Sequence, residues 1–230
     1  AACPKNIDFA DLYFQYTNSE GWQLEDGIVK SGSSNIDSGV GIRSVAGDKS
    51  GFAYSNNFNY ENLISAAKTS KCIVKSGQSR EIQLGNSQNI RKLYNSVSPL
   101  DFKTDDIKVK FLKDIDKYVR DKDDRVEQVI VSLAGTYDSI LILNTDGIKA
   151  FDDRPLVRFS IMVILKVGDR RERGSSGGGG RYSYDEIIDT KFAYEFADEA
   201  IRQAAVNLQA EDGKAGSMTV VLGPGWPGVL

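Results

Sequence analysis

Histidine is absent from this chain of 230 residues, and cysteine occurs only twice. The chain therefore lacks the side chain that most often moves protons near neutral pH and most often binds metals. A Ser-His-Asp arrangement is excluded within it, and Ser44, Ser132 and Ser160 also lack the glycine-flanked turn of a serine hydrolase. Cys3 and Cys72 are too few for a disulfide framework, so we expect reduced thiols. A zinc site would need ligands that these residues do not supply.

Long apolar runs are also missing, because no segment approaches the ~18 apolar residues that a membrane-spanning helix needs. The longest apolar stretches, 139–143 and 159–167, have the length of strands. The formal net charge of −3 provides no basic surface for nucleic acid. We therefore expect a cytoplasmic globular protein that binds neither a membrane nor nucleic acid.

The two ends of the chain predict that it is a piece of a longer protein. It begins with Ala1 rather than with methionine, and its last apolar run, Met218 to Leu222, is followed directly by Gly223 to Leu230. No polar tail closes this end. We therefore expect residues 217–230 to form the first strand of a third region that lies beyond Leu230.

Residues 1–76 predict an antiparallel α+β unit. Apolar and aromatic residues recur in the manner of strands over 10–16, 22–30, 39–45 and 51–54. Gly47-Asp48-Lys49 predicts a hairpin turn between the last two of these strands. Asn59 is the expected N-cap of a helix that ends near Ser76 and packs one apolar stripe on the sheet.

Residues 104–216 predict a second α+β unit, which a polar linker or wrapping segment at 77–103 separates from the first. A helix is expected from Thr104, because four apolar residues recur at spacing four from Ile107 to Val119. The charged residues between them predict a solvated helix face.

Antiparallel strands and two more helices complete this second unit. Gly135-Thr136 and Asp146-Gly147 are typical of turns, and a capping box at 183–186 precedes a helix that carries an alanine-rich stripe. The strands are expected at 126–134, 137–144 and 156–167.

The most unusual local feature is a run of four glycines flanked by arginines. Without side chains a peptide or backbone can approach closely, and a guanidinium group can hold a carboxylate or a phosphate. One interpretation is therefore a substrate-binding loop, and the other is a flexible loop that only connects two elements. The candidate residues are Arg173, Gly177, Gly178, Gly179, Gly180 and Arg181.

Other polar and aromatic clusters favour structural roles. Asp152 and Asp153 are adjacent, so on an extended chain they point to opposite faces and are poor partners for acid/base catalysis. Glu25-Asp26-Gly27 predicts either a turn or a bulge. Six aromatic residues of the first unit are expected mainly in its core, with a minority serving a peptide groove or a subunit interface. They are Tyr13, Phe14, Tyr16, Trp22, Phe52 and Tyr54.

Six blocks of the sequence, in order, resemble the TldD branch of the TldD/PmbA family. They are Leu12-Tyr13-Phe14-Gln15, Leu24 to Lys30, Gly39 to Arg43 followed by Gly51-Phe52-Ala53-Tyr54, Asp153 to Arg158, Arg171 to Arg181, and Gly223 to Leu230. The resemblance covers nearly the whole chain. It implies a cytosolic zinc metallopeptidase and a paralogous PmbA (TldE) subunit that partners the catalytic one.

The family's metal motif, His-Glu-x-x-x-His with a later cysteine, follows the block that ends here at Leu230. No metal-binding or catalytic residue of the family can therefore be assigned to a position in this chain. We expect zinc in the full-length protein, and neither zinc nor peptidase activity in this chain alone. We expect the chain to shape the channel for an unfolded peptide substrate. The alternative is an assembly module that only contacts the PmbA/TldE-like partner.

Overall fold

The computed structural model describes residues 7–72, 93–101, 103–211, 213, 215–221 and 223. Antiparallel strands and packed helices confirm the expected α+β class. The elements are, in order, β1 (Phe9–Glu25), β2 (Ile28–Ala46), β3 (Lys49–Ser55), α1 (Tyr60–Cys72), the 3-10 turn η1 (Pro99–Asp101), α2 (Asp105–Lys122), β4 (Val126–Asn144), β5 (Lys149–Val167), β6 (Arg170–Gly180), α3 (Asp185–Ile188) and α4 (Phe192–Leu208).

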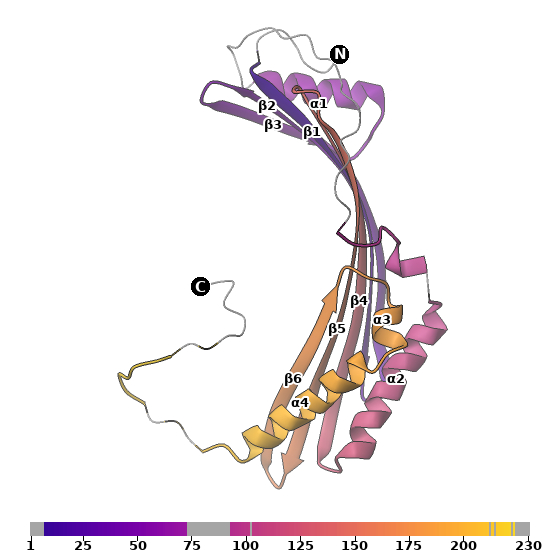
Figure 1. The fold of residues 1–230 in the computed structure, drawn as a ribbon, viewed down its shortest axis with the longest axis vertical. Helices are drawn as coiled ribbons and strands as arrows, with labels where there is room; N and C mark the ends of the chain where they lie inside the picture. Colours follow the sequence, from indigo (N-terminus) through magenta and orange to yellow (C-terminus); the bar gives the residue numbers. More distant parts are fainter. Residues whose placement is uncertain are drawn as a thin grey trace.

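Within the described residues the strands form one six-stranded antiparallel sheet in the order β3-β2-β1-β4-β5-β6. The strands of the two predicted units therefore join, because β1 pairs with β4 continuously from Asp11 to Glu25. Long strands run from an end beside α1, where β3 forms the edge, to an end beside α2 and α4, where β6 forms the edge (Figure 1). The sheet bends into an arch between these ends, as strand twist favours in a long sheet.

All four helices pack on the same face of this sheet. Leu12 and Phe14 of β1 contact the cluster that α1 covers, whereas Leu24 belongs to the cluster beneath α2 and α4. Alternate residues of a strand face the same side, so these three residues place both clusters on one face. The opposite face, called the helix-free face below, carries no helix in the described part of the chain.

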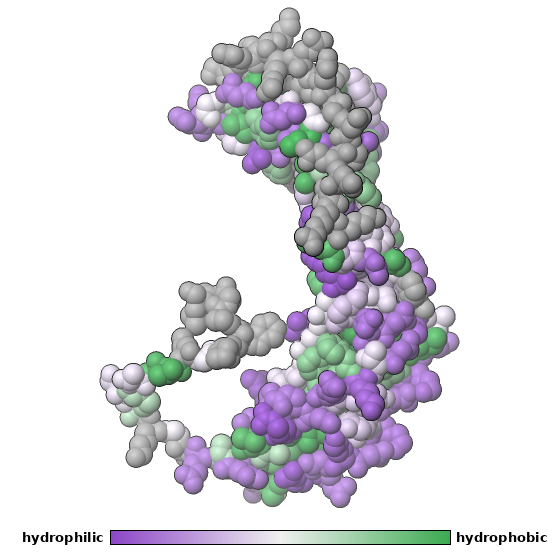
Figure 2. All heavy atoms as spheres, viewed as in Figure 1, coloured by the Kyte–Doolittle hydropathy of each residue, from purple (hydrophilic) through white to green (hydrophobic). Residues whose placement is uncertain are grey.

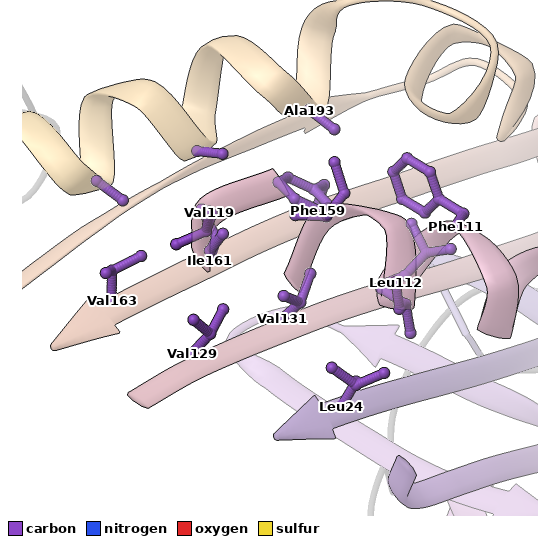
Figure 3. Packing of buried hydrophobic residues seen from close by; sticks show 14 of the residues in the cluster. Leu24, Phe111, Leu112, Val119, Val129, Val131, Phe159, Ile161, Val163 and Ala193 are labelled. Carbon is purple, nitrogen blue, oxygen red and sulfur yellow. The ribbon is translucent and has the colours of Figure 1, made fainter. Parts of the chain in front are cut away.

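The larger core lies between α2, α4 and strands β4 and β5 (Figure 3). Phe111 and Phe159 meet edge to face with their ring centroids 5.9 Å apart. Ala193, Ala197 and other small residues of α4 allow that helix to lie close to the sheet. Burial of these apolar side chains supplies the main stabilising free energy of this end.

One predicted turn lies inside a strand, and one predicted strand contains a turn. Gly135 lies inside β4, which runs unbroken through the predicted turn at Gly135-Thr136. A side chain there would come within 2.3 Å of the Tyr184 hydroxyl oxygen, so the glycine makes room for a distant residue. The predicted strand 22–30 is interrupted between β1 and β2, where the turn predicted as one interpretation of Glu25-Asp26-Gly27 is confirmed, with φ of 50° at Asp26 and 72° at Gly27.

The helix predictions are confirmed in part. Asn59 caps α1, because its side-chain Oδ1 accepts a hydrogen bond of 2.8 Å from the Asn62 amide. Ile107 was expected in the core and is instead 43% exposed. No capping box forms at 183–186, since Tyr184 occupies the N-cap position of α3 without a side-chain hydrogen bond. The end of α1 predicted near Ser76 lies outside the described residues.

The charged face of α2 is solvated as expected, except at Lys108 and Asp116, which are 1% and 6% exposed. The Lys110 and Lys117 side chains are 76% and 72% exposed, and hydrophilic residues cover much of this end of the molecule (Figure 2). Lys108 is instead buried and takes part in the core. None of the helices in the described ranges combines the length and apolar character required to span a bilayer.

The strand expected at 217–230 is not formed over the described residues of that segment. Residues 215–221 and 223 have no regular secondary structure, and residue 222 lies outside the described part. A strand needs a hydrogen-bonding neighbour, and no described residue pairs with this segment. The expected third region beyond Leu230 stays a prediction.

Candidate functional site

The glycine run is an edge strand rather than the loop that its composition predicted. Arg173 and the four glycines all lie in β6, which pairs with β5 from Val157↔Gly180 to Val167↔Arg170. β6 has a strand neighbour on one side only, so its other side is an edge of the sheet. Five of the six candidate residues therefore belong to the sheet, and Arg181 follows directly after it.

Close packing explains why these positions are glycine. A Cβ atom at Gly174 would lie 2.0 Å from the Ala200 carbonyl oxygen of α4, and one at Gly178 would lie 2.6 Å from the Phe196 ring. At Gly177 and Gly179 it would lie 2.5 and 2.0 Å from carbonyl oxygens of β5. At Gly174, Gly177 and Gly179 a side chain would require backbone movement, and at Gly178 it would require the Phe196 ring to move, so the glycines let β6 approach both neighbours.

Helix α4 occupies part of the β6 edge. The side-chain amide of Asn207 donates to the Arg173 carbonyl oxygen at 2.9 Å, and the Ser175 amide donates to Oε1 of Gln203 at 3.5 Å. Residues of an antiparallel edge strand alternate between pairing inward and facing outward. Gly177 and Gly179 therefore also present their amide and carbonyl groups outward, and no described residue bonds to those groups.

The two flanking arginines are not brought together. Arg173 is the fourth residue of β6 and Arg181 follows its last residue, which separates them by ~25 Å at the rise of an extended strand. Arg181 lies over the Tyr94 ring at 5.3 Å and donates from Nη1 to the Pro155 carbonyl oxygen at 3.3 Å. Arg173 is exposed, and no side chain in the described ranges pairs with its guanidinium group. A single anion clamp made by both residues is excluded.

Arg181 borders a polar cluster on β5. Asp152 accepts hydrogen bonds from Tyr94 Oη at 2.8 Å and from Arg154 Nε at 2.6 Å. Burial acts to raise the pKa of the Asp152 carboxyl, but the hydrogen bonds from Arg154 and Tyr94 outweigh it and lower the pKa. Burial and the bond to Asp152 raise the pKa of the Tyr94 hydroxyl. Asp152 is thus held as a carboxylate. It is not an acid/base partner of Asp153, which accepts a hydrogen bond from the Ser139 hydroxyl.

A second candidate region is a groove of about 500 Å³ on the helix-free face. Tyr13 of β1 and Phe52 and Tyr54 of β3 line it, and these side chains are 37%, 59% and 80% exposed. They were expected mainly in the core. Period-two alternation does separate them from their buried neighbours, but it does not reveal which face of the sheet the helices cover.

The described residues do not suit a metal centre. No group of three or more His, Cys, Asp or Glu side chains in this part of the chain is placed to hold a metal ion. Cys72 is exposed and free, and histidine is absent from the sequence. The zinc that the family resemblance implies therefore does not fit the side chains described.

Two family models match this chain. Residues 10–71 match "PmbA/TldA metallopeptidase domain 1" and residues 98–208 match "PmbA/TldA metallopeptidase central domain". The chain is 47% identical over 232 residues to the metalloprotease TldD homolog of Haemophilus influenzae, covering 98% of this chain and 48% of that protein. It is 39% identical over 234 residues to the TldD homolog of Buchnera aphidicola from Schizaphis graminum, covering 99% and 48%.

Solved structures share the fold. TldE from Thermococcus kodakarensis matches with a TM-score of 0.70 at 14% identity, over 86% of this chain and 44% of that one. A proposed modulator of a DNA gyrase from Thermotoga maritima matches with a TM-score of 0.70 at 17% identity, over 90% and 46%.

The sheet, its helices and these matches define the amino-terminal and central architecture of a metallopeptidase family. The chain belongs to the PmbA/TldD family. It spans about half the length of the curated relatives that it matches.

Proposed function

We propose that this chain is the substrate-holding part of a TldD-like zinc metallopeptidase that cleaves unfolded peptides in the cytoplasm. The observation that carries the proposal is the outward backbone of Gly177 and Gly179 at the β6 edge, which α4 leaves without a partner. An extended peptide can add to such an edge as a further strand. Membership of a metallopeptidase family supports a peptide as the occupant.

Pairing through the backbone selects for conformation more than for side chains. A folded protein cannot offer a free extended strand, whereas an unfolded peptide offers one anywhere along its length. The engaged outward groups of Arg173 and Ser175 limit the free edge to the glycine end of β6. We therefore propose that the peptide pairs with β6 only along Gly177–Gly180, with Arg181 at one end of the paired segment.

The flanking arginines supply charge to this edge. Arg181 keeps donors beyond the one used on Pro155, so it can receive a carboxylate of a peptide that reaches the end of β6. Arg173 is exposed at the other end. We retain both residues as proposed substrate contacts that act separately, because the length of β6 divides them.

Hydrolysis itself belongs, in this proposal, to zinc ligands outside this chain. The described side chains hold and align the peptide, and the chain alone is expected to show no peptidase activity. Metal analysis of the isolated chain is expected to find no stoichiometric zinc, and one zinc per chain would contradict the proposal.

N-methylated peptides test the edge pairing in the full-length protein. Methylation of one peptide nitrogen removes a donor, and the loss of one hydrogen bond is expected to raise KM about fivefold. Alternate nitrogens of an added strand point away from the edge, so methylation there is the matched control. Equal KM values for both sets of peptides would contradict strand addition.

A PmbA/TldE-like subunit is the second part of the proposal. Between the two core clusters Tyr16 and Ile36 are 41% and 62% exposed, although both are large and apolar or aromatic. Such side chains are typical of interaction surfaces when they lie together. Ile36→Asp is expected to weaken association of the full-length protein with its paralogue, measured by native mass spectrometry. Unchanged association would favour contacts away from Tyr16 and Ile36.

A further inference from the structure

The groove on the helix-free face has walls of side chains and a floor of glycine. β1 contributes Tyr13 to one wall and β3 contributes Tyr54 to the other, while Gly39 and Gly41 of β2 lie between them. A Cβ at Gly41 would lie 2.9 Å from the Phe52 ring, so that ring leans over this glycine. At Gly39 a Cβ would meet only the Ser55 carbonyl oxygen, at 3.4 Å, so this part of the floor is less crowded.

One end of the groove is acidic. Thr17 of β1 stands opposite Asp37 of β2 and opposite Asp138 of β4 in the sheet register. Asp138 Oδ1 accepts hydrogen bonds from Thr17 at 2.5 Å and from Gln15 at 3.2 Å. Asp37 lines the groove, and no described cation pairs with its carboxylate.

The nearby cations are already engaged. Arg154 stands opposite Asp138 in the register but binds Asp152, and Arg43 binds Asp11 at 2.8 Å. The groove therefore combines exposed aromatic rings with a carboxylate that lacks a counter-ion in the described part of the molecule. Aromatic faces and a carboxylate together favour a guanidinium or ammonium group.

We propose that this groove binds an arginine or lysine side chain of an extended protein segment. The cation lies against Tyr54 and Tyr13 and reaches the Asp37 carboxylate, while the segment's backbone crosses the glycine floor. Charge complementarity selects a basic segment over a neutral one. The site lies near the β3 edge of the sheet, away from the β6 edge, and its existence does not depend on the proposed peptidase activity.

Two peptides that differ only in an arginine or a citrulline at one position test the binding of the cation. Citrulline keeps the shape of arginine and loses its charge. Fluorescence anisotropy with the full-length protein, in a chelator that prevents cleavage, measures both dissociation constants. The arginine peptide is expected to bind about tenfold more tightly than the citrulline peptide.

Two groove variants and two matched controls locate the effect. Asp37→Asn and Tyr54→Ala are expected to reduce the tenfold ratio to threefold or less. Asp48→Asn in the β2–β3 turn and Tyr60→Ala on α1 remove the same groups elsewhere on the surface and are expected to preserve the ratio. A ratio near one in the unmodified protein, or an undiminished ratio in both groove variants, would overturn the proposal.

Discussion

Lys108 Nζ lies 2.6 Å from Oε1 of Glu20, and the two side chains are only 2% and 12% exposed. This ion pair joins α2 to β1 on the helix-covered face. The ammonium group also lies 5.4 Å from the Tyr184 ring centroid, so α3 contributes to the same cluster. Burial, together with the negative charge of Glu20, raises the pKa of the Tyr184 hydroxyl.

Loss of one partner of this pair leaves the other charge buried and unpaired. Lys108→Ala is therefore expected to lower the free energy of unfolding by about 3–5 kcal/mol. Lys108→Met combined with Glu20→Leu should recover most of that loss, because neither charge remains. Denaturant unfolding measures both values.

The matched control for this prediction is Lys110→Ala on the same helix. Its ion pair with Asp114 is exposed, so its removal should leave the unfolding midpoint nearly unchanged. Equal destabilisation by both lysine variants would show that the buried pair has no special role.

Gly174→Ala tests whether close packing explains the glycines of β6. The new Cβ would lie 2.0 Å from the Ala200 carbonyl oxygen, which is backbone and cannot move alone. We expect a loss of at least about 2 kcal/mol in the free energy of unfolding. Gly178→Ala should cost less, because the Phe196 ring that it meets can turn. Gly213→Ala, which meets nothing within 4 Å, serves as control.

The sequence correctly predicted those structural features that depend only on residues near one another in the chain. Asn59 caps α1 because its side chain bonds an amide of the next turn, and the strand alternation near Tyr54 follows from the pleat alone. Gly135 and Lys108 were misjudged because their partners, Tyr184 and Glu20, are distant in sequence. A glycine inside a strand resembles a turn until the side chain that needs the space is known.

The sequence singled out the residues of the candidate site, but it did not predict that they form a strand. The glycine run was noticed, yet four glycines predict a loop because glycine weakens an isolated strand. Contacts with α4 and β5 decide the conformation here, and no local rule contains them. The sequence allowed that a minority of the aromatic residues serve a groove, but not which ones, since their exposure depends on which face the helices cover.

Asp152 gives a pH dependence with a defined sign. Its pKa is lowered in the folded protein, so its contribution to stability is present above the unfolded value of ~3.9 and is lost as pH falls through the folded value. Asp152→Asn should therefore destabilise the protein near neutral pH, and the difference should shrink below about pH 4. Tyr94→Phe removes one of its donors and should give a smaller change in the same direction. Unfolding curves between pH 2 and 7 provide the comparison.

Photo-cross-linking of an extended peptide to the full-length protein tests the central claim most directly. A peptide with a photoreactive side chain is bound in the presence of a chelator, irradiated, and its adducts are mapped by mass spectrometry. We expect adducts on or beside Gly177–Arg181, and their loss when the edge-facing nitrogens of the peptide are methylated. Adducts confined to the part of the protein outside this chain would contradict the account and favour an assembly role.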